Sequence, residues 1–277
     1  MELYTHGAPP QEIENRIARL QKMLSEQDID GALILQKSDF FYFSGTLQQG
    51  WFYIPAQGKP LLMIFKDFDR AKAESPIQSV ISIISPKEIP DILRNMGYPS
   101  LLNLGMELDV LPANLYFQYS TIFKSSKIKD ISTGIRLIRA VKSSYEIDLI
   151  EKAAVMSDKV AAKVPEILEA GKSEVAFAGE IEAFARSLGH QGIIRMRLWG
   201  SEIFYGHIMS GASAAVPSYM ASPTGGYGTG SATSQGAGFK KIEKNVPVLV
   251  DYVFALNGYL AARSDGLRLF VSMHFAT

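Results

Sequence analysis

Short apolar runs alternate with helical stretches through the N-terminal part of the chain, and this alternation constrains the fold more than any other feature. The runs are Gly31–Leu35, Trp51–Ile54, Leu61–Phe65, Val80–Ile84 and Leu101–Met106. Apolar residues recur at helical spacing from Glu12 to Ser25, which indicates an amphipathic helix. A second helical stretch runs through Ile89, Leu93 and Met96. Strands alternating with helices predict an α/β layered domain.

The length of the chain predicts a second compact unit. At 277 residues the chain exceeds the usual size of one domain. Hydrophobic residues make up 47% and charged residues 20%, which is typical of a globular protein rather than a disordered one. We therefore expect two units, each with its own core.

Charge and terminal sequence limit the classes of partner. Lys+Arg and Asp+Glu both number 28, so the chain has no net positive field of the kind that nucleic-acid binders carry. No apolar stretch approaches the length needed to span a membrane, and the N-terminus lacks the pattern of a signal peptide. We expect no nucleic-acid partner, no membrane association and a cytoplasmic location.

A change of pattern between Ile131 and Lys142 predicts the boundary between the units. Ser132-Thr133-Gly134 and the basic residues that follow are interpreted as a connection. We place the first domain at residues 1–136 and the second at 143–277. A capping-box pattern at Ser143 and Glu146 predicts a long helix from about Ser144, which Pro165 could kink or shorten.

The second half of the chain begins with helices and continues with strands and loops. Ser173 as a cap and Gly189 as a terminator delimit a second helix. Further on, Val246–Tyr259 is interpreted as two strands joined by an Asn257-Gly258 turn.

A glycine-rich segment, Thr224–Gly238, separates these helices and strands. It lacks the Gly-Lys-Ser/Thr ending of a phosphate-binding loop and the helix-opening glycine of a dinucleotide fingerprint. We therefore expect a flexible or substrate-lining loop rather than a nucleotide site.

Several segments, taken in order, resemble the creatinase, prolidase and Xaa-Pro aminopeptidase family. Near the C-terminus these are Val248-Leu249-Val250-Asp251, Asn257-Gly258-Tyr259 and Ser264–Phe270. Lys142–Ala154 resembles the opening helix of the family's catalytic domain, and Arg16–Gly45 resembles the start of its N-terminal domain. The resemblance implies a creatinase-type α/β domain, with a mixed sheet flanked by helices, followed by part of an α+β pita-bread domain.

The resemblance also implies a metal site. In the family, carboxylates bridge two divalent ions, which would be manganese, cobalt or zinc, and Asp251 matches the first metal-binding Asp. A carboxylate at the end of an apolar strand is costly to bury unless a cation or hydrogen-bond donors neutralise it. A turn-facing Asp is the alternative. Because the chain has no cysteine, His, Asp and Glu are the available ligands.

Three departures from the family pattern affect the site. The second metal-binding Asp is expected where Ala262 stands, and Asp265, three residues later, is a weaker candidate because an odd offset reverses the face of a strand. Ser218 occupies the place of a histidine on the substrate side of the site. His207 is assigned to the substrate side as well, with a purely structural role as the alternative. The third departure is that the family's remaining His and two Glu ligands are expected beyond Thr277, so the catalytic domain is interpreted as truncated.

Three functions stay open at this point. The first is a metal-dependent hydrolase acting on the N-terminal end of proline-containing peptides, expected to be inactive as this chain. The second is a non-catalytic relative that binds peptide or a partner, which Ser218 favours. The third is an amidinohydrolase of the creatine type on the same fold. The resemblance further implies a homodimer.

Overall fold

The structure is a computed structural model and describes residues 7–197, 205–219 and 224–263. Contacts divide the chain into two compact units. The first unit runs to Lys142 and also includes Arg197, and the second begins at Ser143. Within the described ranges, no helix is long and apolar enough to cross a membrane.

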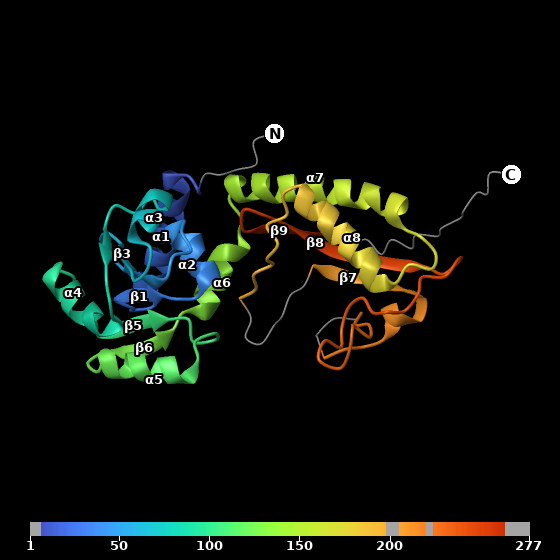
Figure 1. The fold of residues 1–277 in the computed structure, drawn as a ribbon. Helices are drawn as coiled ribbons and strands as arrows, with labels where there is room; N and C mark the ends of the chain where they lie inside the picture. The colour runs from blue at the N-terminus through green and yellow to red at the C-terminus, as the bar shows by residue number, and fades with distance from the viewer. Residues whose placement is uncertain (1–6, 198–204, 220–223, 264–277) are drawn as a thin grey trace. The chain divides into compact units, whose positions relative to one another are not determined.

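The first unit is built on a six-stranded mixed sheet with the strand order β4-β3-β2-β1-β5-β6 (Figure 1). The strands are β1 (Gly31–Ile34), β2 (Gly50–Pro55), β3 (Leu61–Ile64), β4 (Val80–Ser82), β5 (Asn103–Met106) and β6 (Lys127–Asp130). β2 pairs antiparallel with β1 and β3, while the pairs β3–β4, β1–β5 and β5–β6 are parallel. The predicted mixed α/β fold is confirmed.

Helices cover both faces of this sheet. They are α1 (Pro10–Glu26), α2 (Lys37–Ser44), α3 (Phe68–Glu74), α4 (Ile89–Asn95), α5 (Ala113–Ile122), α6 (Ser132–Ala140) and the short 3-10 helix η1 (Pro86–Glu88). One core contains Ile34 and Ile54 together with residues of α1, α2, α3 and α6. The other contains Leu33 and Tyr53 together with residues of α4 and α5. Alternate strand residues thus enter opposite cores, so the apolar runs of the sequence are buried on both sides.

Helix α2 has no counterpart in the sequence prediction. Its N-cap is Gln36, whose side chain accepts hydrogen bonds from the backbone nitrogens of Ser38 and Asp39. Glutamine is not among the residues that usually cap helices, and the aromatic residues Phe40–Phe43 favour strands. Gly45 ends the helix in the left-handed conformation, with φ 77°.

The sequence predicts a connection between the units at Ile131–Lys142. The structure instead has helix α6 in this segment. Ile135 is fully buried and packs into the core of the first unit. Arg136 is exposed while Arg139 pairs with the buried Asp39, so these basic residues belong to a helix packed on the first unit rather than to a linker. The domain limits 1–136 and 143–277 stay a prediction, although a limit at 136 would cut through α6.

The second unit packs two helices on one face of a three-stranded antiparallel sheet (Figure 1). Its elements are α7 (Ser144–Ile167), α8 (Glu174–Ser187), β7 (Gly206–Ser210), the 3-10 helix η2 (Gly211–Ala215), β8 (Val248–Leu256) and β9 (Tyr259–Arg263). Both hydrogen bonds of the predicted capping box at Ser143 and Glu146 are present. The helix continues through Pro165 to Ile167, so the proline does not split it.

The predicted hairpin between β8 and β9 is also present. Asn257 and Gly258 have φ values of 48° and 84°, and both therefore adopt the positive φ that a two-residue turn of this kind requires. The turn fixes the register, which pairs Val253 with Ala262 and Leu256 with Tyr259.

Candidate functional site

The sheet of the second unit has one face packed on helices and one face that carries polar residues. Val248, Val250, Tyr252 and Phe254 alternate along β8 and enter the core with α7 and α8. Asp251 lies between them in the sequence, and its side chain therefore points to the opposite face. We call this face, which His207 on β7 shares, the His207 face.

His207 and Asp251 are direct cross-strand partners on this face. The antiparallel register of β7 and β8 places the two residues opposite each other. Burial raises the pKa of Asp251, and the neighbouring His207 partly offsets this rise. Burial also lowers the pKa of His207, and the Asp251 carboxylate partly offsets that fall. His207 is consequently neutral at neutral pH, and it can take part in hydrogen bonds both as a donor and as an acceptor.

The glycine-rich segment covers part of the His207 face. Its first residue, Thr224, has its hydroxyl 2.6 Å from the Nδ1 atom of His207. A side-chain carbon on Gly226 would lie 2.2 Å from the sulfur of Met209 on β7. Gly226 and Gly228 also have positive φ values of 85° and 63°. Gly226 therefore allows the close approach of this segment to Met209, and Gly228 allows the segment to pack on its own residue Thr233.

A buried carboxylate anchors the same segment. Glu174, at the start of α8, is 1% exposed. Its Oε2 atom accepts a hydrogen bond of 3.1 Å from the nitrogen of Gly238, and its Oε1 atom accepts one of 2.8 Å from the nitrogen of Ser210 and another from the hydroxyl of Ser213. This role of Glu174 could not be predicted from the sequence, because the acid stands directly after the cap residue Ser173, where acids are common for helix-dipole reasons.

Ser218 lies beside the glycine-rich segment. A side-chain carbon on Gly225 would lie 2.4 Å from the backbone nitrogen of Ser218, so the two chain segments are in close contact there. Ser218 is half-buried. Its assignment to substrate binding, like that of His207, stays a prediction.

The described residues do not by themselves fit a divalent metal pair. Asp251 faces His207, but no group of three or more His, Asp or Glu residues that could hold a metal occurs in residues 7–197, 205–219 and 224–263. Asp265, the weaker predicted ligand, lies outside the described residues. Ala262 is opposite Val253, and it therefore shares the face of Asp251. A methyl group thus stands where the resemblance implies a second carboxylate.

These features define a two-unit protein with a mixed α/β domain followed by a helix-backed antiparallel sheet that presents an Asp and a His. Residues 16–141 match the Creatinase/Prolidase N-terminal domain, and residues 148–265 match metallopeptidase family M24. The chain therefore belongs to the creatinase, prolidase and M24 peptidase family.

Similar proteins agree with this membership. An Xaa-Pro dipeptidase of Pyrococcus furiosus is 28% identical over 255 residues, which cover 89% of this chain and 62% of that protein. The solved prolidase structure from the same organism has a TM-score of 0.69 at 25% identity and covers 88% of this chain and 67% of its own. An Xaa-Pro dipeptidase structure from Bacillus anthracis has a TM-score of 0.73 at 20% identity, covering 90% and 63%, and shows the shared fold. The chain thus spans about two thirds of these proteins.

Proposed function

We propose that this chain recognises the N-terminal end of proline-containing peptides through the His207 face of the second unit. The single observation that carries the proposal is the cross-strand pair of His207 and Asp251 on a sheet of the M24 type. The similarity to Xaa-Pro dipeptidases supports peptide as the substrate class.

We further propose that the 277-residue chain binds such peptides without hydrolysing them. Metal-dependent peptidases need several ligands to hold their ions, and the described residues supply Asp251 alone at a position that the family uses. Manganese, cobalt or zinc would be the metal of a complete site. Ser218 favours the non-catalytic function, because a serine hydroxyl cannot replace an imidazole as a proton donor near neutral pH.

Binding and hydrolysis can be separated with matched ligands. The chain is titrated with Ala-Pro, with Ala-Ala and with creatine while backbone amide signals are followed by NMR, and proline release is assayed in the same samples with manganese. We expect Ala-Pro to shift signals of β7 and β8 more strongly than Ala-Ala, without release of proline. A stronger response to creatine would favour the amidinohydrolase, and no response to any ligand would reject the proposal.

The family membership also suggests an oligomer and a location. We infer a homodimer, since members of this family commonly self-associate, and we propose a cytoplasmic location. Light scattering at rising protein concentration should report twice the chain mass, and a monomer throughout would contradict the dimer.

A further inference from the structure

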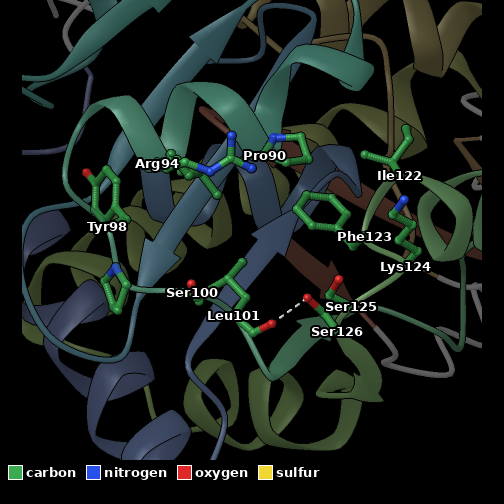
Figure 2. A pocket seen from close by; sticks show the side chains of 12 residues that line it. Pro90, Arg94, Tyr98, Ser100, Leu101, Ile122, Phe123, Lys124, Ser125 and Ser126 are labelled. Carbon is green, nitrogen blue, oxygen red and sulfur yellow. Dashed lines mark hydrogen bonds between the residues drawn. The ribbon is translucent and has the colours of Figure 1, made fainter.

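A pocket in the first unit lies where the last turns of α4 and α5 meet. Its volume is about 260 Å³, just below the range of ~300–1,000 Å³ that is typical of small-molecule sites. Leu93 and Phe123 line it and are 4% and 5% exposed, so they belong to the core and give the pocket a fixed apolar wall. Figure 2 shows the Phe123 ring among the surrounding side chains.

The charged residues that line the pocket are both basic. They are Arg94, in the last turn of α4, and Lys124, two residues after α5. Arg94 forms an exposed ion pair of 2.8 Å with Asp91, which is a weak interaction in water. Lys124 has no partner among the described residues.

Hydroxyl groups add further donors. Ser100 and Ser125 line the pocket and make no hydrogen bond within the described part of the chain. Ser126 is already engaged, because its hydroxyl donates to the carbonyl of Leu101 at 2.6 Å (Figure 2). The available side-chain groups are therefore two cations and two hydroxyls.

Helix dipoles reduce this positive character. The C-terminal ends of α4 and α5 each carry the equivalent of roughly half a negative charge. Arg94 and Lys124 together contribute two full positive charges, and Asp91, the ion-pair partner of Arg94, contributes one negative charge. Lys124 therefore carries the pocket's positive charge that no side chain pairs with among the described residues.

We propose that this pocket binds a small organic carboxylate with an apolar ring or chain. The carboxylate would be held by Lys124, Arg94 and Ser125, and the apolar part would lie against Phe123 and Leu93. All of these residues belong to the first unit, whereas His207 and Asp251 belong to the second.

Benzoate and benzamide, which have nearly the same shape but differ in charge, test the proposal. Each is titrated into the full chain while backbone amides are followed by NMR. We expect benzoate to shift the signals of residues 93–101 and 122–126 and to bind about tenfold more tightly than benzamide. Affinity should fall as salt is added, since the groups involved are exposed to solvent.

Charge-removing variants give the decisive comparison. Lys124→Gln should weaken benzoate binding about tenfold, whereas Lys127→Gln, an exposed lysine of β6 outside the pocket, should leave it unchanged. Equal binding of benzoate and benzamide, no shifts in either segment, or equal weakening by both variants would overturn the proposal. Neither variant alters a buried residue, so both should fold.

Discussion

Glu107 is a buried acid whose neutral form the fold favours. It is 2% exposed, and its Oε2 atom accepts hydrogen bonds from the backbone nitrogens of Leu35 and Gln36. Burial, together with the nearby Asp39 carboxylate, raises the pKa of Glu107 well above its usual value. The Oε1 atom has no donor among the described residues. Asp39 is itself paired with Arg139 and Arg197.

Replacing Glu107 with glutamine should therefore stabilise the first unit at neutral pH. An acid whose pKa is higher in the folded than in the unfolded state stabilises the fold fully at pH values below its pKa in the unfolded state. This stabilisation is lost as the pH rises from that value towards the pKa in the folded state. We expect the free energy of unfolding of Glu107→Gln to exceed that of the wild type by a margin that grows above about pH 4.5, by at most ~1.4 kcal/mol per pH unit. Urea unfolding at several pH values measures the margin. A margin that does not depend on pH would show that Glu107 is ionised in the folded chain.

The tight packing of the glycine-rich segment predicts which of its glycines tolerate a larger side chain. A side-chain carbon on Gly228 would lie 1.7 Å from the carbonyl oxygen of Thr233, and its φ is 63°. Gly228→Ala should destabilise the second unit by about 2 kcal/mol or more. Gly230, two residues on, has open space around it, so Gly230→Ala should change stability by less than ~0.5 kcal/mol. Thermal unfolding compares the two, and equal effects would mean that the segment does not pack on itself as described.

Elements with a strong local signal could be predicted from the sequence, while those that depend on tertiary contacts could not. The capping box at Ser143 and the turn at Asn257-Gly258 are local hydrogen-bonding and dihedral requirements, and both predictions are confirmed. Strand β6 (Lys127–Asp130) contains no apolar run. Its extended conformation depends on its parallel pairing with β5 in the sheet. Nothing in its own sequence indicates that pairing.

The same distinction applies to the candidate site. Asp251 could be predicted because it follows an apolar strand and matches a family segment. The position of His207 opposite Asp251 could not, because it depends on the register of two strands far apart in the sequence. The anchoring of the glycine-rich segment by Glu174 likewise needs three separate elements to come together.

At the scale of the whole molecule, the predicted two domains should be separable by a protease. Lys142 is exposed and lies between α6 and α7, while Arg136 and Arg139 are within α6. Limited trypsin digestion should therefore cut after Lys142 before it cuts after either arginine. Mass spectrometry identifies the products, and a resistant fragment that runs intact through Lys142 would argue against the boundary.

Among residues 7–197, 205–219 and 224–263, this member of the M24 family presents Asp251 on the His207 face without the further carboxylates that a metal pair needs. Because Ala262 shares this face, Ala262→Asp would place a second carboxylate near the first. Two carboxylates should bind a divalent cation more tightly than one.

Calorimetry with manganese is the most direct test, performed on the wild type, Ala262→Asp and Asp251→Asn. We expect weak uptake by the wild type, with no tightly bound pair of ions, and an affinity about tenfold higher for Ala262→Asp. Tight binding of two ions per wild-type chain that is lost in Asp251→Asn would contradict this expectation.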